Sequence, residues 1–354
     1  MTTTYADSGV DIEAGDQASS TAYSHALNTF ASRSNMIGEP VKLEGGYSGL
    51  MDFGDFYLVQ NDDGVGSKVE VARKVGKYDT LGHDLLAMVV DDAVCVGAET
   101  VSINNTIDTE KVDNVVTDKL LGGLSKVCSE QKVIISGGEI AELPGLVNGF
   151  TWNSSAVGVV AKDKVLTNEK ISIGDSVVTL KSGVVRSNGL SLVRKILNDQ
   201  FGDDWYSQEW KNGITWGEII LTPSVIYASA VLDMLGRYGQ ESKAPVHGVS
   251  HITGGGMTNI RRILKRNNLG VDLDNLFAPH EAVLDLMRLG NVSDEEAYKV
   301  WNMGNGMMII TPDPDKVIEI ATKNGIKAQN AGTVILEPEI RFESKALSQS
   351  KLVF

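Results

Sequence analysis

The segment from Asn61 to Lys68 combines side chains that could together bind a metal ion and a polyphosphate. Its sequence is Asn-Asp-Asp-Gly-Val-Gly-Ser-Lys, and it directly follows a strand-like apolar run at residues 56–59. Carboxylates bind a hard divalent cation through oxygen, glycines let backbone N–H groups approach phosphate oxygens, and a lysine offsets negative charge. Because Asp and Gly are also the commonest turn residues, the segment alone fits a plain tight turn equally well.

Three more carboxylates lie in an apolar run from Thr80 to Val96. The run predicts a helix that Thr80 caps and that is apolar on most of its circumference, so the helix should be buried. At about 100° per residue, Asp84 and Asp91 lie about 20° apart on its surface, and Asp92 lies about 80° from Asp84. A buried carboxylate needs a cationic partner or a metal ion. A solvated stripe or pairing with basic residues would explain one of the three, but it is a strained explanation for all of them.

A third polar cluster follows the apolar residues Val133–Ile135. There a predicted strand ends in Gly137 and Gly138, and Glu139 comes directly after them. The ends of strands are where α/β folds bind ligands. A hairpin or a strand-to-helix turn explains the two glycines equally well, so Glu139 is a candidate ligand only in combination with the other clusters.

Two glycine-containing loops in the second half of the chain each precede a predicted helix. The first, residues 181–189, lies between a strand at 177–180 and an amphipathic helix at 190–197. A helix N-terminus attracts anions through its unpaired N–H groups and its dipole, and Arg186 in this loop adds positive charge. The second loop contains His251 and the consecutive glycines 254–256, before a helix that begins near Met257. This setting favours a site role for His251 over that of a structural histidine.

The elements that must position these residues alternate between strand-like and helix-like segments, which is typical of an α/β or α+β protein. With 354 residues and 42% hydrophobic content, the chain is long enough for two cores. Single domains commonly stop growing at roughly 250 residues. Polar residues at 162–169 indicate a boundary, so we expect domains at residues 1–170 and 171–354.

The chain lacks the P-loop and Rossmann glycine signatures, which excludes those standard nucleotide sites.

The chain carries 46 acidic and 32 basic residues, a net charge of −14. This excess disfavours binding to a phosphate backbone, so we expect no nucleic-acid partner. A polyphosphate bound by so acidic a protein needs local neutralisation, which a divalent cation such as Mg²⁺ supplies. No apolar run reaches the ~18 residues that cross a bilayer, and no export signal is recognised, so we expect a cytoplasmic protein without membrane contact. The cysteines, Cys95 and Cys128, are expected to be small buried hydrophobes.

The wording and order of several short blocks resemble the phosphoribosylformylglycinamidine cyclo-ligase family, also called aminoimidazole ribonucleotide synthetases. The resemblance runs through nearly the whole chain, and its first block goes beyond the motifs of relatives such as selenophosphate synthetase and thiamine-monophosphate kinase. The blocks are residues 9–15 (Gly-Val-Asp-Ile-Glu-Ala-Gly), 45–50 (Gly-Gly-Tyr-Ser-Gly-Leu), 63–68 (Asp-Gly-Val-Gly-Ser-Lys), 97–99 (Gly-Ala-Glu), 137–139 (Gly-Gly-Glu), 187–189 (Ser-Asn-Gly), 251–256 (His-Ile-Thr-Gly-Gly-Gly) and 302–304 (Asn-Met-Gly).

The resemblance implies an ATP-dependent ring closure in purine biosynthesis, with Mg²⁺ and with formylglycinamidine ribonucleotide as substrate. ATP would phosphorylate the formyl oxygen, and the amidine nitrogen would then attack the formyl carbon and release phosphate. Catalysis of this kind is largely positioning and charge neutralisation. The resemblance also implies two α/β domains, the first for ATP, metal and dimerisation and the second completing the substrate site, in a homodimer whose N-terminal sheets pair.

The resemblance assigns metal and catalytic roles by position. Asp63, Asp92 and Glu139 match acids around the magnesium of the nucleotide, and Asp91 is kept as a neighbouring candidate ligand. Lys68 would face phosphate. The candidates for catalysis are Asp63, Lys68 and His251, the last through proton transfer or substrate orientation.

It also assigns binding roles. The nucleotide would contact two sets of residues, a segment that resembles a mobile cover over ATP and a set of polar residues and a glycine around the phosphates. These are Gly45, Gly46, Ser48 and Gly49 in the cover, and Asp63, Gly64, Lys68, Asp84 and Glu139 around the phosphates. The substrate would contact Arg186, Ser187, Asn188, Gly189, His251, Gly254, Gly255 and Asn302.

Four positions depart from the family pattern. Asp62 adds negative charge where threonine is usual, and Ile140 replaces a hydroxyl. Arg186 stands in place of histidine, in a loop one residue longer, and could still bind phosphate. Asn305 stands where an apolar residue is usual. Two alternatives therefore stay open, namely a sister ATP-dependent enzyme that phosphorylates a different amide or small anion, and a catalytically silent nucleotide-binding homologue.

Overall fold

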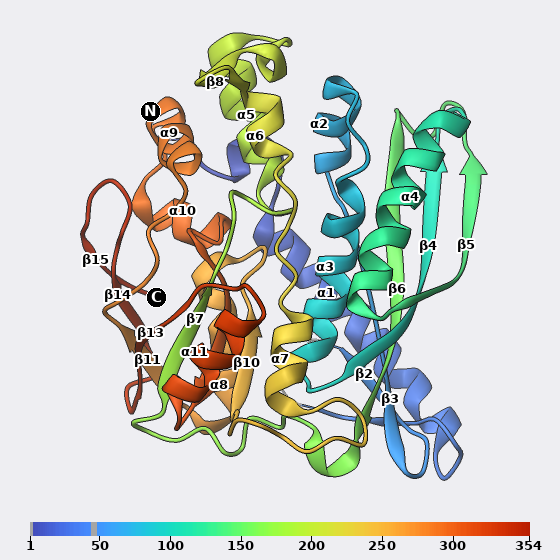
Figure 1. Cartoon of the computed structure of the whole chain (residues 1–354), viewed down its shortest axis with the longest axis vertical. Helices are drawn as coiled ribbons and strands as arrows, with labels where there is room; N and C mark the ends of the chain where they lie inside the picture. The colour runs from blue at the N-terminus through green and yellow to red at the C-terminus, as the bar shows by residue number, and fades with distance from the viewer. Residues whose placement is uncertain (1–2, 44–47) are drawn as a thin grey trace.

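The computed structural model describes residues 3–43 and 48–354. Two β-sheets form its framework, one from strands before residue 162 and one from strands after residue 175, with helices packed between and around them (Figure 1). The chain is thus a mixed α/β protein, as the alternating pattern predicts. Gly45 and Gly46, which the family resemblance assigns to the ATP cover, lie outside the described residues.

The first sheet has six strands within the described ranges, in the order β1-β2-β3-β6-β4-β5. Its neighbours are antiparallel except β4 and β5, which are parallel. The strands are β1 (Glu39–Val41), β2 (Gly49–Asp52), β3 (Phe56–Gly64), β4 (Glu99–Thr109), β5 (Ile134–Glu142) and β6 (Phe150–Ala161). Helices α2 (Lys68–Val75), α3 (Leu81–Val94) and α4 (Asn114–Gln131) pack on one face (Figure 1).

The opposite face of the first sheet is polar and open along its central strands. Burial alternates along β6, because Trp152 and Ser154 face the helices while Thr151 and Asn153 are exposed. Such alternation is typical of an antiparallel sheet with one packed face. A groove of about 320 Å³ lies here, lined by Asp62, Asp63, Gly64, Asn104, Thr106, Asn153, Ser154 and Ser155.

The second sheet has seven strands in the described part of the chain, in the order β10-β12-β7-β13-β11-β14-β15. They are β7 (Ser176–Lys181), β10 (Gly248–His251), β11 (Gly270–Leu273), β12 (Asn305–Thr311), β13 (Ala328–Ile335), β14 (Ile340–Glu343) and β15 (Lys351–Val353). A small hairpin joins β8 (Glu209–Lys211) to β9 (Ile214–Thr215). The remaining helices are α1 (Ile12–Phe30), α5 (Leu190–Phe201), α6 (Trp216–Ile220), α7 (Ala228–Leu235), α8 (Arg261–Leu264), α9 (Glu281–Gly290), α10 (Asp294–Val300) and α11 (Pro314–Lys323).

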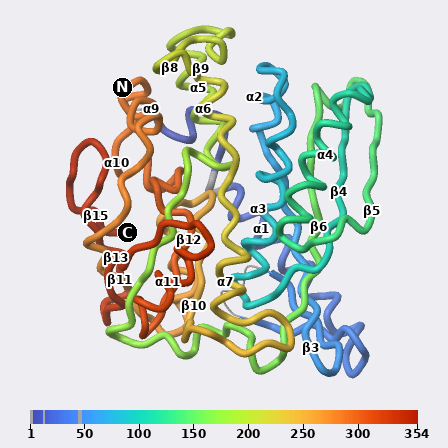
Figure 2. Tube along the Cα trace, in the orientation of Figure 1, coloured from blue at the N-terminus to red at the C-terminus, as the bar shows by residue number. Residues whose placement is uncertain are grey.

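Helix α3 joins the two halves of the molecule. It packs on β3 and β6 of the first sheet, and it also contacts α7 and β10 of the second half; α3 and α7 lie side by side (Figure 2). Most of its residues are buried, as its apolar circumference predicts. The helix begins at the expected place, but the expected cap is wrong: the side chain of Thr80 makes no capping hydrogen bond.

Strand β5 differs from the sequence expectation. The glycines at 137 and 138 lie inside the strand, which continues to Glu142, so they form no turn. A Cβ on Gly138 would lie 2.6 Å from the carbonyl oxygen of Asn105 on the neighbouring strand. The close approach of two backbones within the sheet therefore explains this glycine.

The two cysteines are buried, as expected, and neither forms a disulfide. Among the helices of residues 3–43 and 48–354, none is both long enough and apolar enough to cross a bilayer.

Helices α3 and α4 cross in direct backbone contact. A Cβ on Gly82 would lie 2.5 Å from the backbone nitrogen of Leu124, and a Cβ on Gly123 would lie 2.2 Å from the carbonyl oxygen of Asp79. Only glycine allows this approach, and it sets the position of the helix that carries Asp84, Asp91 and Asp92.

We expect Gly82→Ala to lower the free energy of unfolding by about 1–3 kcal/mol, because the added methyl group must push α4 away from α3. Gly122→Ala, also in α4, is the matched control, since nothing lies within 4 Å of its added Cβ. Alanine should there stabilise the helix by up to ~1 kcal/mol. Urea unfolding of both variants measures the difference, and equal effects would contradict the packing argument.

Candidate active site

Three loops from distant parts of the sequence meet beside α3. A Cβ on Gly66, after β3, would lie 3.8 Å from the backbone oxygen of Ser187, after β7. A Cβ on Gly254, after β10, would lie 3.7 Å from Oδ1 of Asn188. Gly66 has a φ of +65°, in the left-handed region that favours glycine. The structure thus brings together the three glycine-containing segments that the sequence singled out.

The buried polar atoms without a partner among the described residues include two from the residues that directly follow Arg186 in the loop after β7. These two are the hydroxyl oxygen of Ser187 and the amide nitrogen Nδ2 of Asn188. Leaving a buried polar group unpaired costs free energy, so such groups in a native protein commonly have a functional cause. A ligand with oxygen acceptors, such as a phosphate, would pair with both. Ser48, from the expected ATP cover, also has a buried hydroxyl oxygen without a described partner.

Asp63 on β3 and Asp92 on α3 form a pair of neighbouring carboxylates. Burial, and to a smaller extent the Asp92 carboxylate, raise the pKa of Asp63 to about 6, although its side chain still reaches solvent. Burial also raises the pKa of Asp92 to about 7, against the opposing charges of Arg262 and Arg186.

One oxygen of each carboxylate is already engaged. Oδ1 of Asp63 accepts from the backbone N–H of Gly64 at 2.6 Å, and Oδ1 of Asp92 lies 2.7 Å from Nδ1 of His251. The other oxygens have no hydrogen-bond partner within the described residues. Two adjacent carboxylates that resist joint ionisation fit a divalent cation, because it neutralises both.

Lys68 is inside the protein rather than at an open surface. Its Nζ donates to Oδ1 of Asp84 at 2.8 Å and to the carbonyl oxygen of Thr222 at 2.8 Å, and both charged side chains are fully buried. Ser224 donates to the same Asp84 oxygen through its hydroxyl and its backbone N–H. Burial lowers the pKa of Lys68, and Asp84 opposes that shift. In this structure the lysine therefore neutralises Asp84 and is not exposed to a phosphate.

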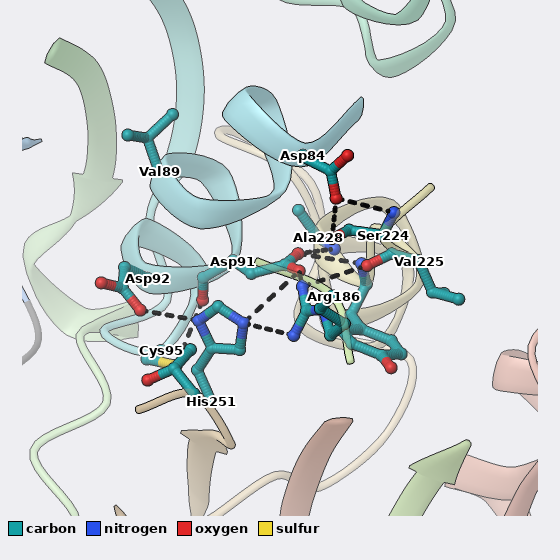
Figure 3. A network of polar contacts seen from close by, with 12 residues as sticks. Asp84, Val89, Asp91, Asp92, Cys95, Arg186, Ser224, Val225, Ala228 and His251 are labelled. Carbon is teal, nitrogen blue, oxygen red and sulfur yellow. Dashed lines mark hydrogen bonds and ion pairs between the residues drawn. The ribbon is translucent and has the colours of Figure 1, made fainter. Parts of the chain in front are cut away.

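Arg186 is also buried, and its expected contact with phosphate is not available in this structure. Its Nη2 donates to Oδ2 of Asp91 at 2.9 Å and to the carbonyl oxygen of Val225 at 3.1 Å (Figure 3). The other Asp91 oxygen accepts from the backbone N–H groups of Tyr227 and Ala228. Asp91 is thus an ion-pair partner and not an open metal ligand. Pairing with basic residues, which the sequence made credible for one of the three carboxylates and strained for all three, accounts for both Asp84 and Asp91.

His251 links Arg186 to Asp92. Its Nε2 lies 2.6 Å from Nη1 of Arg186, and its Nδ1 lies 2.7 Å from Asp92, so both ring nitrogens are engaged (Figure 3). Burial, and then the charge of Arg186, lower the pKa of His251 to about 3. The ring is therefore neutral at physiological pH.

Glu139 lies away from the carboxylate pair. Across the sheet, Asp63 is aligned with Ser154, Asn105 and Gly138 in turn, which places β5 three strands from β3. At about 4.8 Å per strand, that separation is roughly 14 Å. The residues described here contain no group of three or more His, Cys, Asp or Glu side chains that could hold a metal ion. The expected convergence of four acids on one ion is therefore not found among the described residues of one chain.

Asn302 and the nearby glycines shape the loops. Asn302 accepts from the backbone N–H of Gly304 at 3.0 Å and donates to the carbonyl oxygen of Val184 at 3.4 Å. Gly189 has a φ of +68° and lies against Trp301, where a Cβ would be 2.4 Å from the indole nitrogen. Gly255 has a φ of +99°.

Asn305, which stands where the family usually has an apolar residue, has a structural role. Its side-chain oxygen accepts from the hydroxyl of Thr179 and from the backbone N–H of Phe277, both at 3.0 Å. It therefore ties β12 to β7 and to the segment before α9.

Nothing in the sequence indicated that the segment from Thr222 to Ala228 contributes to these buried charge pairs. It supplies the carbonyl oxygens of Thr222 and Val225 and the donors at Ser224, Tyr227 and Ala228. Most of these groups belong to the backbone, which carries no residue signature. No motif in the sequence could have located them.

The comparisons with known proteins agree with this two-sheet architecture. The family model for the N-terminal domain of AIR synthase related proteins matches residues 45–160, and the model for their C-terminal domain matches residues 172–345. Among solved structures, a chain of the HypE–HypF complex is similar with a TM-score of 0.60 at 16% identity, over 87% of this chain and 92% of that chain. Thermotoga maritima PurL complexed with AMPPCP has a TM-score of 0.55 at 16% identity, over 88% of this chain and 45% of that chain. At such identity the likeness concerns the fold alone. These matches define the chain as a two-domain protein of the AIR synthase related class.

Curated relatives narrow the class further. A Thermococcus kodakarensis protein named phosphoribosylformylglycinamidine cyclo-ligase is 40% identical over 96% of this chain and 98% of its own length. A Pyrococcus horikoshii protein of the same name is 39% identical over 95% of this chain and 96% of its own length. The chain belongs to the phosphoribosylformylglycinamidine cyclo-ligase family, which confirms the resemblance of the sequence blocks.

We expect Asp91→Asn to lower the free energy of unfolding by about 3–5 kcal/mol, because it leaves the Arg186 charge buried without its counter-ion. The amide oxygen can still accept from the backbone N–H groups, so the measured loss reports the charge. The matched control is Asp52→Asn, which removes a partly exposed ion pair with Lys162. That variant should change the free energy of unfolding by less than ~1 kcal/mol. Denaturant unfolding compares the two, and a small loss for Asp91→Asn would contradict the pairing.

The carboxylate of Asp63 should make stability depend on pH in metal-free protein. Its folded pKa of about 6 lies above the ordinary value of 3.8, so the folded state binds more protons between these values. Stability conferred by the neutral carboxyl is then lost as pH rises through this window. Relative to Asp63→Asn, the native chain should become less stable between pH 4 and pH 7, about the limits of that window. Unfolding with a chelator present measures this, and a difference independent of pH would refute the assignment.

Proposed function

We propose that the protein closes the imidazole ring of aminoimidazole ribonucleotide from formylglycinamidine ribonucleotide, with ATP converted to ADP and phosphate. The observation that carries this proposal is identity of 35–40% to curated relatives named phosphoribosylformylglycinamidine cyclo-ligase, over nearly the full length of each chain. Binding of ATP is further supported by structural neighbours solved with nucleotides, among them PurL with AMPPCP, ADP and ATP.

The junction of the three loops is the proposed reaction site. The free hydroxyl of Ser187 and amide of Asn188 would bind phosphate oxygens of the substrate, next to the glycines of the loop after β10. Transfer of the γ-phosphoryl group to the formyl oxygen creates a good leaving group, and attack of the amidine nitrogen on the formyl carbon then releases phosphate. The protein contributes mainly alignment of the reactants and shielding from water.

Asp63 and Asp92 are the residues proposed to hold Mg²⁺. Their unshared oxygens, their proximity and their raised pKa values support this choice. When bound, Mg²⁺ would neutralise charge on the triphosphate. Lys68 is proposed to hold the loop after β3 in place by neutralising Asp84, and so to position Asp63 from within the protein.

Assembly and location are parts of the same proposal. The open polar face of the first sheet, with exposed apolar residues such as Ile134 and Ile140 on its edge strand, would pair with the same face of a second copy. A partner could then bring Glu139 close to a nucleotide. We propose domains at residues 1–170 and 171–354, and a cytoplasmic location.

Two other functions would give different results in a turnover assay. A sister enzyme that phosphorylates a different amide would account for the departures at Asp62, Ile140 and Arg186, but the full-length relatives favour the cyclo-ligase. A silent nucleotide-binding homologue is opposed by the carboxylate pair, because such charges are costly to keep without use.

The test is turnover by the purified full chain with Mg²⁺, ATP and formylglycinamidine ribonucleotide. We expect equimolar ADP, phosphate and aminoimidazole ribonucleotide, measured by chromatography. ATP hydrolysis that does not depend on the substrate would favour a sister enzyme. Nucleotide binding without any turnover would favour the silent homologue, and either result would overturn the proposal.

A further inference from the structure

A single buried guanidinium connects the substrate loop with the carboxylate pair. Arg186 has a φ of +56°, unusual for a residue with a side chain, and its side chain is completely buried. Its Nη2 donates to Oδ2 of Asp91 and to the carbonyl oxygen of Val225. Its Cζ lies over the ring of Tyr227, 5.1 Å from the ring centroid. The remaining arm, Nη1, points at Nε2 of His251. The guanidinium therefore has little freedom to turn.

This arrangement determines where the proton on His251 lies. A guanidinium can only donate hydrogen bonds, so Nε2 of His251 must be the acceptor. A neutral imidazole then carries its proton on Nδ1, and that N–H donates to Oδ1 of Asp92. Asp92 is held through one oxygen, and its other oxygen is left for a different partner.

We propose that Arg186, acting through the fixed tautomer of His251, is a positioning residue that orients Asp92 toward the divalent cation. The same residue directly precedes Ser187 and Asn188, so one strained backbone position sets both the proposed phosphate contacts and the proposed metal ligand. This inference rests on the proposed Mg²⁺ site. Residues that hydrogen-bond to a metal-binding side chain commonly fix the orientation of that side chain in this way.

The geometry favours this positioning role over the proton transfer that the sequence suggested for His251. Neither ring nitrogen is open to a substrate, since one accepts from Arg186 and the other donates to Asp92. The ring is a link between two charged groups.

Two variants of His251 separate its two hydrogen bonds. In His251→Asn the amide nitrogen can replace Nδ1 and donate to Asp92, but the contact with Arg186 is lost. In His251→Gln the amide oxygen can replace Nε2 and accept from Arg186, but the contact with Asp92 is lost. Arg186→Lys is a third variant that keeps a positive charge beside Asp91. His247→Gln is the matched control, because Nδ1 of His247 also lies 2.8 Å from an aspartate, Asp175, away from the site.

The first measurement is the ¹⁵N NMR spectrum of the metal-free full chain labelled with ¹⁵N-histidine. We expect the His251 signal, assigned with His251→Gln, to show a protonated Nδ1 and an unprotonated Nε2. In Arg186→Lys this pattern should change, because a lysine cannot hold the geometry of both contacts. A proton on Nε2 in the native chain would overturn the inference, whatever the protein catalyses.

The second measurement is calorimetric binding of Mg²⁺ with AMPPCP present, together with kcat at saturating Mg²⁺. We expect His251→Gln to weaken Mg²⁺ binding by about 10- to 100-fold, His251→Asn to weaken it less, and His247→Gln to leave it unchanged. At saturating Mg²⁺ both His251 variants should recover kcat to within about 10-fold of the native value.

Other outcomes are equally decisive. Loss of kcat by about 10²–10⁴ in both variants at any Mg²⁺ concentration would instead show proton transfer by His251. Equal Mg²⁺ affinity in native chain and His251→Gln would refute the positioning role. Absence of Mg²⁺ binding to the native chain would refute the proposed metal site itself, and the tautomer would still show whether Arg186 fixes the ring.

Discussion

The pairing of buried charges along one face of α3 is the constraint on which the rest of the structure depends. Asp84 meets Lys68 and Asp91 meets Arg186, with all four side chains closed to solvent. In the interior no such charge can be left alone at tolerable cost. The loop after β3, the loop after β7 and the segment before α7 must therefore sit where they complete these pairs, which sets the two halves of the chain against each other.

The same constraint explains the character of the site. Two cations beside the loop junction, Lys68 and Arg186, are paired with aspartates inside the protein and are not available to a ligand there. A triphosphate meeting Asp63 and Asp92 would be repelled unless a cation intervened. The net charge of −14 and the local geometry thus both require a cation between the protein and a bound triphosphate. Arg186 shows how a departure from the family pattern can serve the site from within, by orienting other groups.

The comparisons contribute differently to fold and to chemistry. Neighbours at 12–16% identity share the two-sheet architecture although they are different proteins, among them HypE, PurL and ThiL. A fold hosts many reactions, so it carries no substrate assignment. The substrate assignment comes from relatives that match almost end to end, and from residues 63–68 and 187–189, whose loops the structure brings together.

By itself the sequence determined the mixed α/β class, the buried course of α3 and the glycine-containing loops, because periodicity and glycine act over a few neighbouring residues. It also singled out Ser187, Asn188, Asp63 and Asp92 as candidate site residues. Tertiary structure alone decided that Asp91 pairs with Arg186, 95 residues away, that backbone groups at 222–228 complete the pairs, and that Glu139 lies three strands from β3. Those outcomes depend on strand order and on which buried charges become neighbours, and neither is encoded in local spacing.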